Sequence, residues 1–227
     1  MSETSPVAVR PGVNWGLYFL ADFSFSALPV RGIVADIGCG RGTELEGLEA
    51  NDCSAFGIDV DEGALLECRS RGLRVLRAHA EELPMRTACL DGAVCKVVLP
   101  YTDESRALTE IARVLKPGGV GHFSYHGAGY YLRYLLEGRT WAFRLYGLRT
   151  LFNTWFFALS GRRLPGFLGD TIYQSSGRLA KHYRNAGLRL RQNREAKTFY
   201  GWPVFMYHVV ERGPDWTGIG AGPGGGA

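Results

Sequence analysis

The sequence predicts an α/β fold built on a doubly wound, mostly parallel sheet of seven strands. Short apolar runs alternate with helix-forming segments over the first half of the chain, which is typical of strands joined by helical crossovers. A cluster of glycines follows the first apolar run, and two strand-like segments lie near the end. These three observations predict one sheet at the centre of a single domain, residues 1–227.

Each expected element has its own local signal. Apolar runs bounded by turn residues predict strands at 32–37, 53–58, 73–78, 92–98 and 119–125. The stretches between them predict helices at 42–50, 61–71 and 103–115, and Pro117-Gly118-Gly119 predicts the turn before the fifth strand. A helix at 177–187 ends at a glycine, and strands at 188–194 and 204–211 follow it.

The most informative stretch is residues 33–42, where an apolar run breaks into three glycines at alternate positions, 38–42. Glycine lets the backbone approach a nucleotide-like ligand closely, and Asp36 lies just before this turn. Asp59 ends the next apolar run, where a carboxylate can accept both hydroxyls of a ribose. From the residues alone, Asp36 could instead cap the following helix, and Asp59 could start the next one.

Four segments follow one another between about residue 30 and about residue 125. They are Asp36–Gly42 (DIGCGRG), Gly57–Asp59 (GID), Ala80–Pro84 (AEELP) and Leu108–Gly119 (LTEIARVLKPGG). In this order they resemble the first motif, the ribose-binding acid, the adenine-side loop and the fourth helix of the class I S-adenosylmethionine (SAM) methyltransferases. The resemblance implies SAM as the cofactor and a Rossmann-like sheet with an antiparallel last strand.

The resemblance also implies where the cofactor binds. Asp36 is expected at the methionine end of SAM, through its ammonium or a bridging water, and Asp59 at the ribose diol. Relatives with this loop often carry Asp at position 79, where this chain has His79, so the backbone near Ala80 is expected to recognise the adenine. Cys39 is also readily explained as a small space-filling residue. The expected cofactor-binding residues are Asp36, Gly38, Cys39, Gly40, Gly42, Asp59, Val60, Ala80, Glu81 and Lys96.

The acceptor is expected at the carboxyl ends of the fourth and fifth strands, which open onto the ligand crevice. His126, just past the fifth strand, could deprotonate a hydroxyl near neutral pH, or it could be a hydrogen-bonded loop histidine. Tyr101 and Tyr125 could orient the acceptor, contact the cofactor or only pack. Leu99 stands where amino-directed nucleic-acid methyltransferases need a side-chain acceptor, so no nucleic-acid partner is expected. The sequence has no Asp/His/Asp metal pattern, and no metal is expected.

Residues 126–175 are rich in aromatic residues and arginine and are expected to form a helical cap insertion. Spacings of three and four predict one apolar stripe on a helix, made of Trp141, Leu145, Leu148, Phe152, Trp155 and Leu159. Three interpretations stay open. The stripe packs on the core, it lines a pocket for a bulky apolar or aromatic substrate, or it lies on a membrane surface through 130–160.

The composition is that of an ordinary globular protein, with 46% hydrophobic and 21% charged residues and a net charge of +4. Five cysteines without metal-binding spacing favour a reducing compartment. No signal peptide or transmembrane stretch is recognisable, so a cytoplasmic location is expected. Residues 213–227 are expected to be a disordered tail. Residues 15–20 could close over the cofactor or only pack, and the oligomeric state is left open.

Together these features predict a SAM-dependent methyltransferase that acts on an oxygen or nitrogen atom of a small, apolar or aromatic acceptor. A non-catalytic SAM-binding regulator is one alternative, because an intact cofactor site does not prove turnover. A nucleic-acid or protein methyltransferase is another. A nicotinamide-dependent oxidoreductase is disfavoured, because Thr43 stands where its glycine fingerprint needs Gly or Ala.

Overall fold

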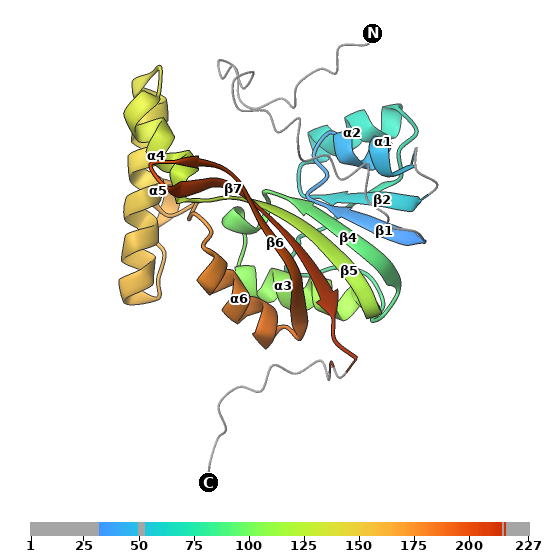
Figure 1. The fold of residues 1–227 in the computed structure, drawn as a ribbon. Helices are drawn as coiled ribbons and strands as arrows, with labels where there is room; N and C mark the ends of the chain where they lie inside the picture. Colours follow the sequence, from blue (N-terminus) through green and yellow to red (C-terminus); the bar gives the residue numbers. More distant parts are fainter. Residues whose placement is uncertain (1–31, 50–52, 215, 217–227) are drawn as a thin grey trace.

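Seven strands form one sheet in the computed structural model, which describes residues 32–49, 53–214 and 216 (Figure 1). The strand order is β3-β2-β1-β4-β5-β7-β6. Neighbouring strands from β3 to β5 are parallel, whereas β7 is antiparallel to both β5 and β6. The predicted fold class, with its antiparallel end of the sheet, is confirmed.

The boundaries agree with the sequence expectations to within a few residues, except at the start of β5 and at the end of β6, which continues past the expected end at residue 194 to Phe199. The strands are β1 (Ile33–Ile37), β2 (Ser54–Asp59), β3 (Val75–Arg77), β4 (Leu90–Lys96), β5 (Leu115–His126), β6 (Leu188–Phe199) and β7 (Trp202–Arg212). β5 begins before the predicted turn, because Pro117-Gly118-Gly119 lies inside the strand, where the pairing with β4 shifts register. The helices are α1 (Thr43–Glu49), α2 (Glu62–Ser70), α3 (Glu104–Val114), α4 (Ala128–Glu137), α5 (Trp141–Ser160) and α6 (Ser176–Asn185), with 3-10 helices η3 (Leu99–Tyr101) and η4 (Gly166–Leu168).

Helices cover both faces of the sheet (Figure 1). α3 and α6 lie on one face, where Leu179 of α6 shares a core cluster with Tyr125 of β5. α1 and α2 lie on the other face, where Leu45 of α1 shares a cluster with Val94 of β4. Because successive residues of a strand point to opposite faces, Tyr125 and His126 point to different sides of the sheet.

Two expectations from the sequence concern the ends of the chain, residues 15–20 and the predicted tail at 213–227. The segment 15–20 lies outside the described residues. Gly213, where the predicted tail begins, donates its N–H to the carbonyl of Gly187 at 3.0 Å. The guanidinium of Arg212 lies 4.4 Å from the ring centroid of Trp216. Packing therefore continues past the predicted start of the tail.

The described residues contain neither a membrane-crossing helix nor a cluster of metal-binding side chains. None of their helices is both long and apolar enough to cross a membrane. In the same part of the chain, His, Cys, Asp and Glu side chains form no group of three or more that could hold a metal ion.

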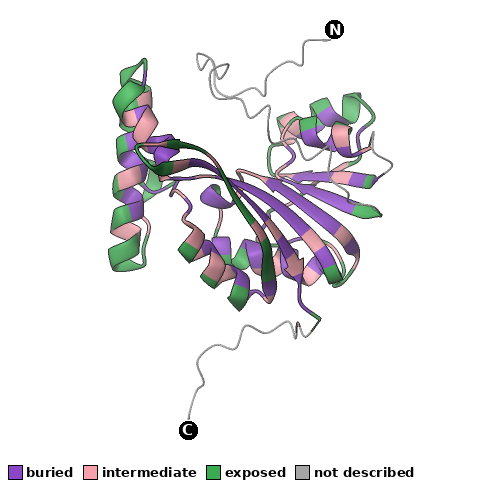
Figure 2. Cartoon of the chain, viewed as in Figure 1, coloured by how far each residue is buried: buried purple, intermediate pink, exposed green. Residues whose placement is uncertain are grey.

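α4 and α5 stand at one end of the molecule, beside the end of the β6–β7 hairpin (Figure 1). α4 meets the hairpin at very short range, since a Cβ on Gly129 would lie 2.3 Å from the carbonyl oxygen of Trp202. The six residues of the predicted apolar stripe lie on α5, where they are 51% to 84% exposed (Figure 2). The interpretation in which the stripe packs on the core is therefore wrong.

The reason is that α5 packs through its small and polar side. Its buried residues are Gly147, Arg149, Thr150, Asn153 and Thr154. Gly147 brings α5 so close to α4 that a Cβ there would lie 2.5 Å from the carbonyl oxygen of Tyr131. Asn153 donates to the carbonyl of Thr171 at 2.8 Å, inside the protein. Close backbone approach and buried hydrogen bonds thus fix the inner side of the helix and leave the apolar side outward.

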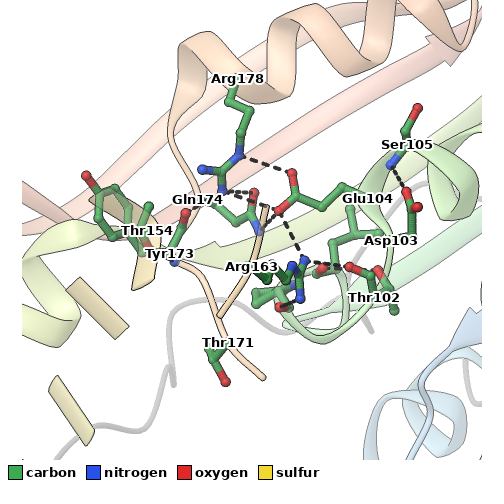
Figure 3. A network of polar contacts seen from close by, with 12 residues as sticks. Thr102, Asp103, Glu104, Ser105, Thr154, Arg163, Thr171, Tyr173, Gln174 and Arg178 are labelled. Carbon is green, nitrogen blue, oxygen red and sulfur yellow. Dashed lines mark hydrogen bonds and ion pairs between the residues drawn. The ribbon is translucent and has the colours of Figure 1, made fainter. Parts of the chain in front are cut away.

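A buried ion network at the start of α3 ties the cap to the sheet (Figure 3). Glu104 is 5% exposed, and its carboxylate accepts from Nε2 of Gln174 at 2.7 Å and from Nε of Arg178 at 3.1 Å. A guanidinium nitrogen of Arg163 lies 4.0 Å from the same carboxylate. Side chains from the segment after α5 and from α6 therefore surround the carboxylate of Glu104 at the start of α3.

The same network reaches the loop after β4. Arg163 donates to the carbonyl of Pro100 at 3.2 Å and to that of Thr102 at 2.6 Å. These two carbonyls flank Tyr101 in η3. The position of Tyr101 thus depends on a guanidinium that comes from beyond α5.

Replacing Glu104 with Gln is expected to lower the free energy of unfolding by about 3–5 kcal/mol, because it leaves largely buried arginines without their carboxylate. The matched control is Glu62→Gln, which removes an exposed partner of Arg69 on α2 and should cost less than about 1 kcal/mol. Denaturant titration followed by circular dichroism measures both variants. Equal losses would show that the network contributes no more than a surface ion pair.

Candidate active site

The glycine turn after β1 is pinned to the end of β2. The backbone N–H groups of Gly38 and Cys39 both donate to the carbonyl of Ile58, at 2.7 and 3.0 Å. Gly38 has a φ of +75°, and a Cβ there would lie 2.0 Å from a methyl of Val98. Gly40 has a φ of +50° and nothing within 4 Å of a built Cβ. The turn is therefore packed on one side and open on the other, as a ligand cradle requires.

Asp59 joins this turn to the end of β2. One oxygen of its carboxylate accepts from the N–H of Gly40 at 2.7 Å. The other accepts from the N–H of Val60 at 2.7 Å and from that of Asp61 at 2.9 Å. Three backbone donors thus fix the carboxylate at the carboxyl end of the strand, where the ribose-binding acid is expected.

A pocket of about 390 Å³ opens beside Asp59. The ends of β1 and β2 and the loops that follow β1, β2, β3 and β4 form its walls. Six of the residues expected from the sequence line it: Gly38, Asp59, Val60, Ala80, Glu81 and Tyr101. His79 also lines the pocket, next to Ala80, so the adenine-side loop lies where the resemblance implies.

Asp36 lies behind the turn as a buried acid. It is 2% exposed, and its Oδ2 has no hydrogen-bond partner among the residues that the structure describes. Burial, together with the neighbouring charge of Glu44, raises the pKa of this carboxyl to about 8 against an opposing effect of Lys96. Lys96 forms an ion pair with Glu44. The site therefore holds an unsatisfied carboxyl that a cationic ligand group would stabilise in its ionised form.

Four of the expected cofactor residues support the site from outside the pocket wall. Cys39 is buried, and a Cβ on Gly57 would lie 2.5 Å from its sulfur, so its side chain fills space against β2. Gly40 contacts Asp59 as described. Gly42 has a φ of +81° and closes the turn before α1. Lys96 pairs with Glu44 rather than lining the pocket.

Tyr125 does not reach the pocket. It is 1% exposed, and its hydroxyl lies 2.6 Å from that of Tyr183, which in turn lies 2.9 Å from Nδ1 of His208. This network occupies the α3 and α6 side of the sheet. The structure therefore contradicts a catalytic role for Tyr125, because its hydroxyl has no access to an acceptor.

His126 lies at the expected strand end, but its environment does not suit a general base. Its ring stacks on Tyr130 with a centroid distance of 3.7 Å and an interplanar angle of 6°. Burial lowers the pKa of the imidazole to about 3, so it remains neutral and weakly basic at neutral pH. The interpretation of His126 as a base is thus disfavoured because the ring is enclosed by aromatic side chains.

Sequence reasoning missed most of the apolar pocket wall, which is made of Ile37, Ile58, Ala78, Val97, Val98 and Thr102. A signal was available, because these residues directly precede or follow the acids and turns at the strand ends. Val97 adds a feature that sequence could not supply. Its φ is +57°, which is rare for a β-branched residue and costs of order 1–3 kcal/mol. Strain of this kind clusters at ligand sites.

The comparisons with known proteins agree with this geometry. A family model described as a methyltransferase domain matches residues 35–123, which run from β1 into β5. Residues 35–123 form a class I SAM-dependent methyltransferase domain. The matched segment contains the glycine turn, Asp59 and the adenine-side loop, and it ends before the cap.

Curated relatives of the methyltransferase domain differ in the acceptors that their names give. The tRNA (carboxymethyluridine(34)-5-O)-methyltransferase ALKBH8 of Mus musculus is 39% identical over 97 residues, which are 41% of this chain and 14% of that protein. The O-methyltransferase rstn1 of Aspergillus nomiae is 35% identical over 95 residues, 37% of this chain and 42% of that protein. The match therefore spans less than half the length of each relative.

Solved structures are similar in fold to this chain over most of its length. A SAM-dependent methyltransferase from Mesorhizobium loti has a TM-score of 0.61 at 19% identity, covering 82% of this chain and 94% of that one. Another from Methanosarcina mazei has a TM-score of 0.58 at 20% identity, with the same coverage. At such identity the likeness establishes the fold alone.

SAM, the cofactor of this family, fits the residues present. Asp59 points a fixed carboxylate into the pocket for the ribose, and the open side of Gly40 leaves room for close backbone approach. The unpartnered Oδ2 of Asp36 suits the ammonium at the methionine end. The methyltransferase domain thus presents a carboxylate for each polar half of the cofactor, and apolar walls for the adenine.

SAM affinity is expected to rise with pH up to about 8, because the Asp36 carboxyl must lose its proton before it accepts an ammonium group. The gain is at most about tenfold per pH unit, the limit for release of one proton. Calorimetric titration between about pH 6 and about pH 7.5, where the amine of SAM is largely charged, measures it. Asp36→Asn should bind more weakly with a flat profile. If SAM affinity rose with pH as steeply in Asp36→Asn as in the wild type, the titrating proton would belong to a group other than Asp36.

Proposed function

We propose that this protein is a SAM-dependent methyltransferase that methylates an oxygen or nitrogen atom of a small, apolar or aromatic acceptor. The observation that carries the proposal is the contact between pocket and cap: the hydroxyl of Tyr101, in the pocket wall, lies 3.3 Å from that of Tyr146 on α5. The aromatic cluster of the cap therefore borders the wall of the cofactor pocket at Tyr101.

Tyrosines and one histidine make up this acceptor side. The hydroxyls of Tyr130 and Tyr134 lie 2.9 Å apart, and the ring of Tyr134 stacks on Phe143 with centroids 5.1 Å apart. Burial raises the pKa of Tyr130, so its hydroxyl stays protonated and neutral. Tyr130 and Tyr134 are buried and form the support behind Tyr101, through which the pocket wall meets the cap, and an aromatic wall of this kind suits an aromatic or apolar acceptor with few polar groups.

The residues then have defined tasks in an in-line methyl transfer. SAM, when bound, supplies a methyl group already activated by its sulfonium. Asp36 and Asp59 hold the two polar ends of the cofactor, and the aromatic cluster excludes water and orients the acceptor. Because the ring of His126 is stacked on Tyr130 and its pKa is lowered by burial, we infer that the acceptor atom is already unprotonated at the working pH and needs no base from His126.

Two other functions have some support. The names of several relatives favour a tRNA acceptor. The family match, however, ends at residue 123, before the cap that would select the acceptor. A non-catalytic SAM-binding regulator would also keep the cofactor residues. The exposed pocket mouth at Tyr101 favours an enzyme, because a regulator has no need of an acceptor chamber.

We also propose a cytoplasmic location. The five cysteines are all free, and four of them are buried. Cys39 and Cys95 have thiol pKa values raised by burial, which makes them unreactive. Unpaired, buried thiols suit a reducing compartment.

Asp59→Ala should weaken SAM binding by about 1–3 kcal/mol, because charge-assisted hydrogen bonds to the ribose are lost. Glu62→Ala is the control, since it removes a nearby exposed carboxylate on α2 that does not line the pocket. Calorimetric titration with SAM compares the two. Unchanged affinity in Asp59→Ala would contradict the assignment of this acid to the ribose.

The acceptor class can be tested by incubating the protein with methyl-labelled SAM and a cell extract, then separating organic-soluble, aqueous, protein and nucleic-acid fractions. Label is expected in the organic-soluble fraction and should disappear with Asp59→Ala. Label in RNA would replace the small-molecule proposal by the tRNA alternative. Absence of label in every fraction, with SAM binding intact, would favour the regulator.

A further inference from the structure

The outer side of α5 is an exposed apolar stripe. Trp141, Leu145, Leu148, Phe152, Trp155 and Leu159 are each at least 51% exposed. At 1.5 Å per residue they extend over about 27 Å. In the adjoining η4, Phe167 and Leu168 are 64% and 52% exposed, and Phe167 packs against Arg149 of α5. An apolar surface of this size usually marks an interaction site.

Only positive charge is left unpaired around the stripe. Residues 138–169 contain five arginines and no Asp or Glu. The acids at the borders are already paired, Glu137 with Arg133 at 3.0 Å and Asp170 with Arg149 at 2.7 Å. Arg139, Arg144 and Arg162 are exposed and pair with no acid in the described structure. They lie before, along and after α5.

This charge pattern distinguishes between two possible occupants. A second copy of the chain would place the same arginine-rich face against itself, with no carboxylate in 138–169 to neutralise it. An anionic lipid surface supplies both missing components, phosphate groups for the arginines and acyl chains for the stripe. Trp141 and Trp155 also suit this boundary, because indole rings prefer the region between headgroups and acyl chains.

We propose that α5 lies on the surface of an anionic phospholipid membrane, with its apolar stripe in the headgroup region and its arginines on lipid phosphates. The opposite side of α5 carries Tyr146, which contacts Tyr101 in the pocket wall. One helix thus separates the membrane from the acceptor side. On the proposed function, the acceptor is therefore a lipid-soluble molecule that enters from the bilayer.

The test is sedimentation of the full chain with vesicles of phosphatidylcholine alone or mixed with phosphatidylglycerol. Binding to the mixed vesicles is expected, together with a blue shift of tryptophan fluorescence. Leu148→Glu/Phe152→Glu should reduce binding at least about tenfold, because charged residues are excluded from the acyl region. Leu66→Glu is the matched control, an equally exposed leucine on the distant α2, and should bind as the wild type does. Arg139→Glu/Arg162→Glu should abolish the preference for anionic vesicles.

Three outcomes would overturn the proposal: no binding to either vesicle, equal loss in Leu66→Glu, or a dimer that Leu148→Glu/Phe152→Glu converts to a monomer with vesicle binding unchanged. The last result would assign the stripe to a contact between copies. SAM binding is measured on the same samples. Intact SAM binding without vesicle binding would refute the membrane inference alone, whereas loss of SAM binding by the wild type would refute the methyltransferase function.

Discussion

The buried carboxylate of Glu104 is the contact on which the arrangement of cap and pocket depends. Moving a carboxylate and a guanidinium out of water is costly, and the cost is offset only when both groups keep their hydrogen bonds. Gln174 and Arg178 satisfy Glu104, and the carbonyls on either side of Tyr101 satisfy Arg163. The pocket wall at Tyr101 and the segment after α5 are therefore held together by these ion pairs and hydrogen bonds. Moving either part would leave a charge without its partner.

Asp36 is the opposite case among the buried acids. Glu104 accepts hydrogen bonds from Gln174 and Arg178, whereas Asp36 has an oxygen without a partner among the described residues and a pKa raised to about 8. The carboxylate of Glu104 stabilises the fold. The buried carboxyl of Asp36, beside the glycine turn, is costly to ionise unless a positive charge lies next to it. A cationic ligand group would supply that positive charge. A buried acid can therefore stabilise the fold at one position and bind a ligand at another.

The sequence was sufficient for the sheet, the glycine turn and the places of Asp36 and Asp59 on β1 and β2, because these depend on local patterns. Apolar runs with a fixed period define strands, and the turn needs glycine at positions of positive φ. The orientation of α5 was not predictable in this way. Hydrophobic periodicity gives the apolar side of a helix but not the direction in which it faces, and here the hydrogen bonds of Asn153 and the close approach at Gly147 decide it.

Tyr125 and His126 fail as predicted catalytic residues for a related reason. Their position at the carboxyl end of β5 is correct, but pocket access depends on which face of the sheet each side chain takes and on what covers it. Tyr183 covers Tyr125, and Tyr130 covers His126. Both covering residues come from elements after β5, α6 and α4, so no local pattern around positions 125 and 126 could reveal them.

The hairpin, α4 and α5 are stacked through contacts in which main chain meets main chain. At Gly129 and Gly147 the neighbouring carbonyl oxygen stands where a side chain would begin. The spacing of these layers is thus set by atoms that every residue possesses. Such a stack can accept different side chains on its outer surface while the spacing of the hairpin, α4 and α5 stays the same.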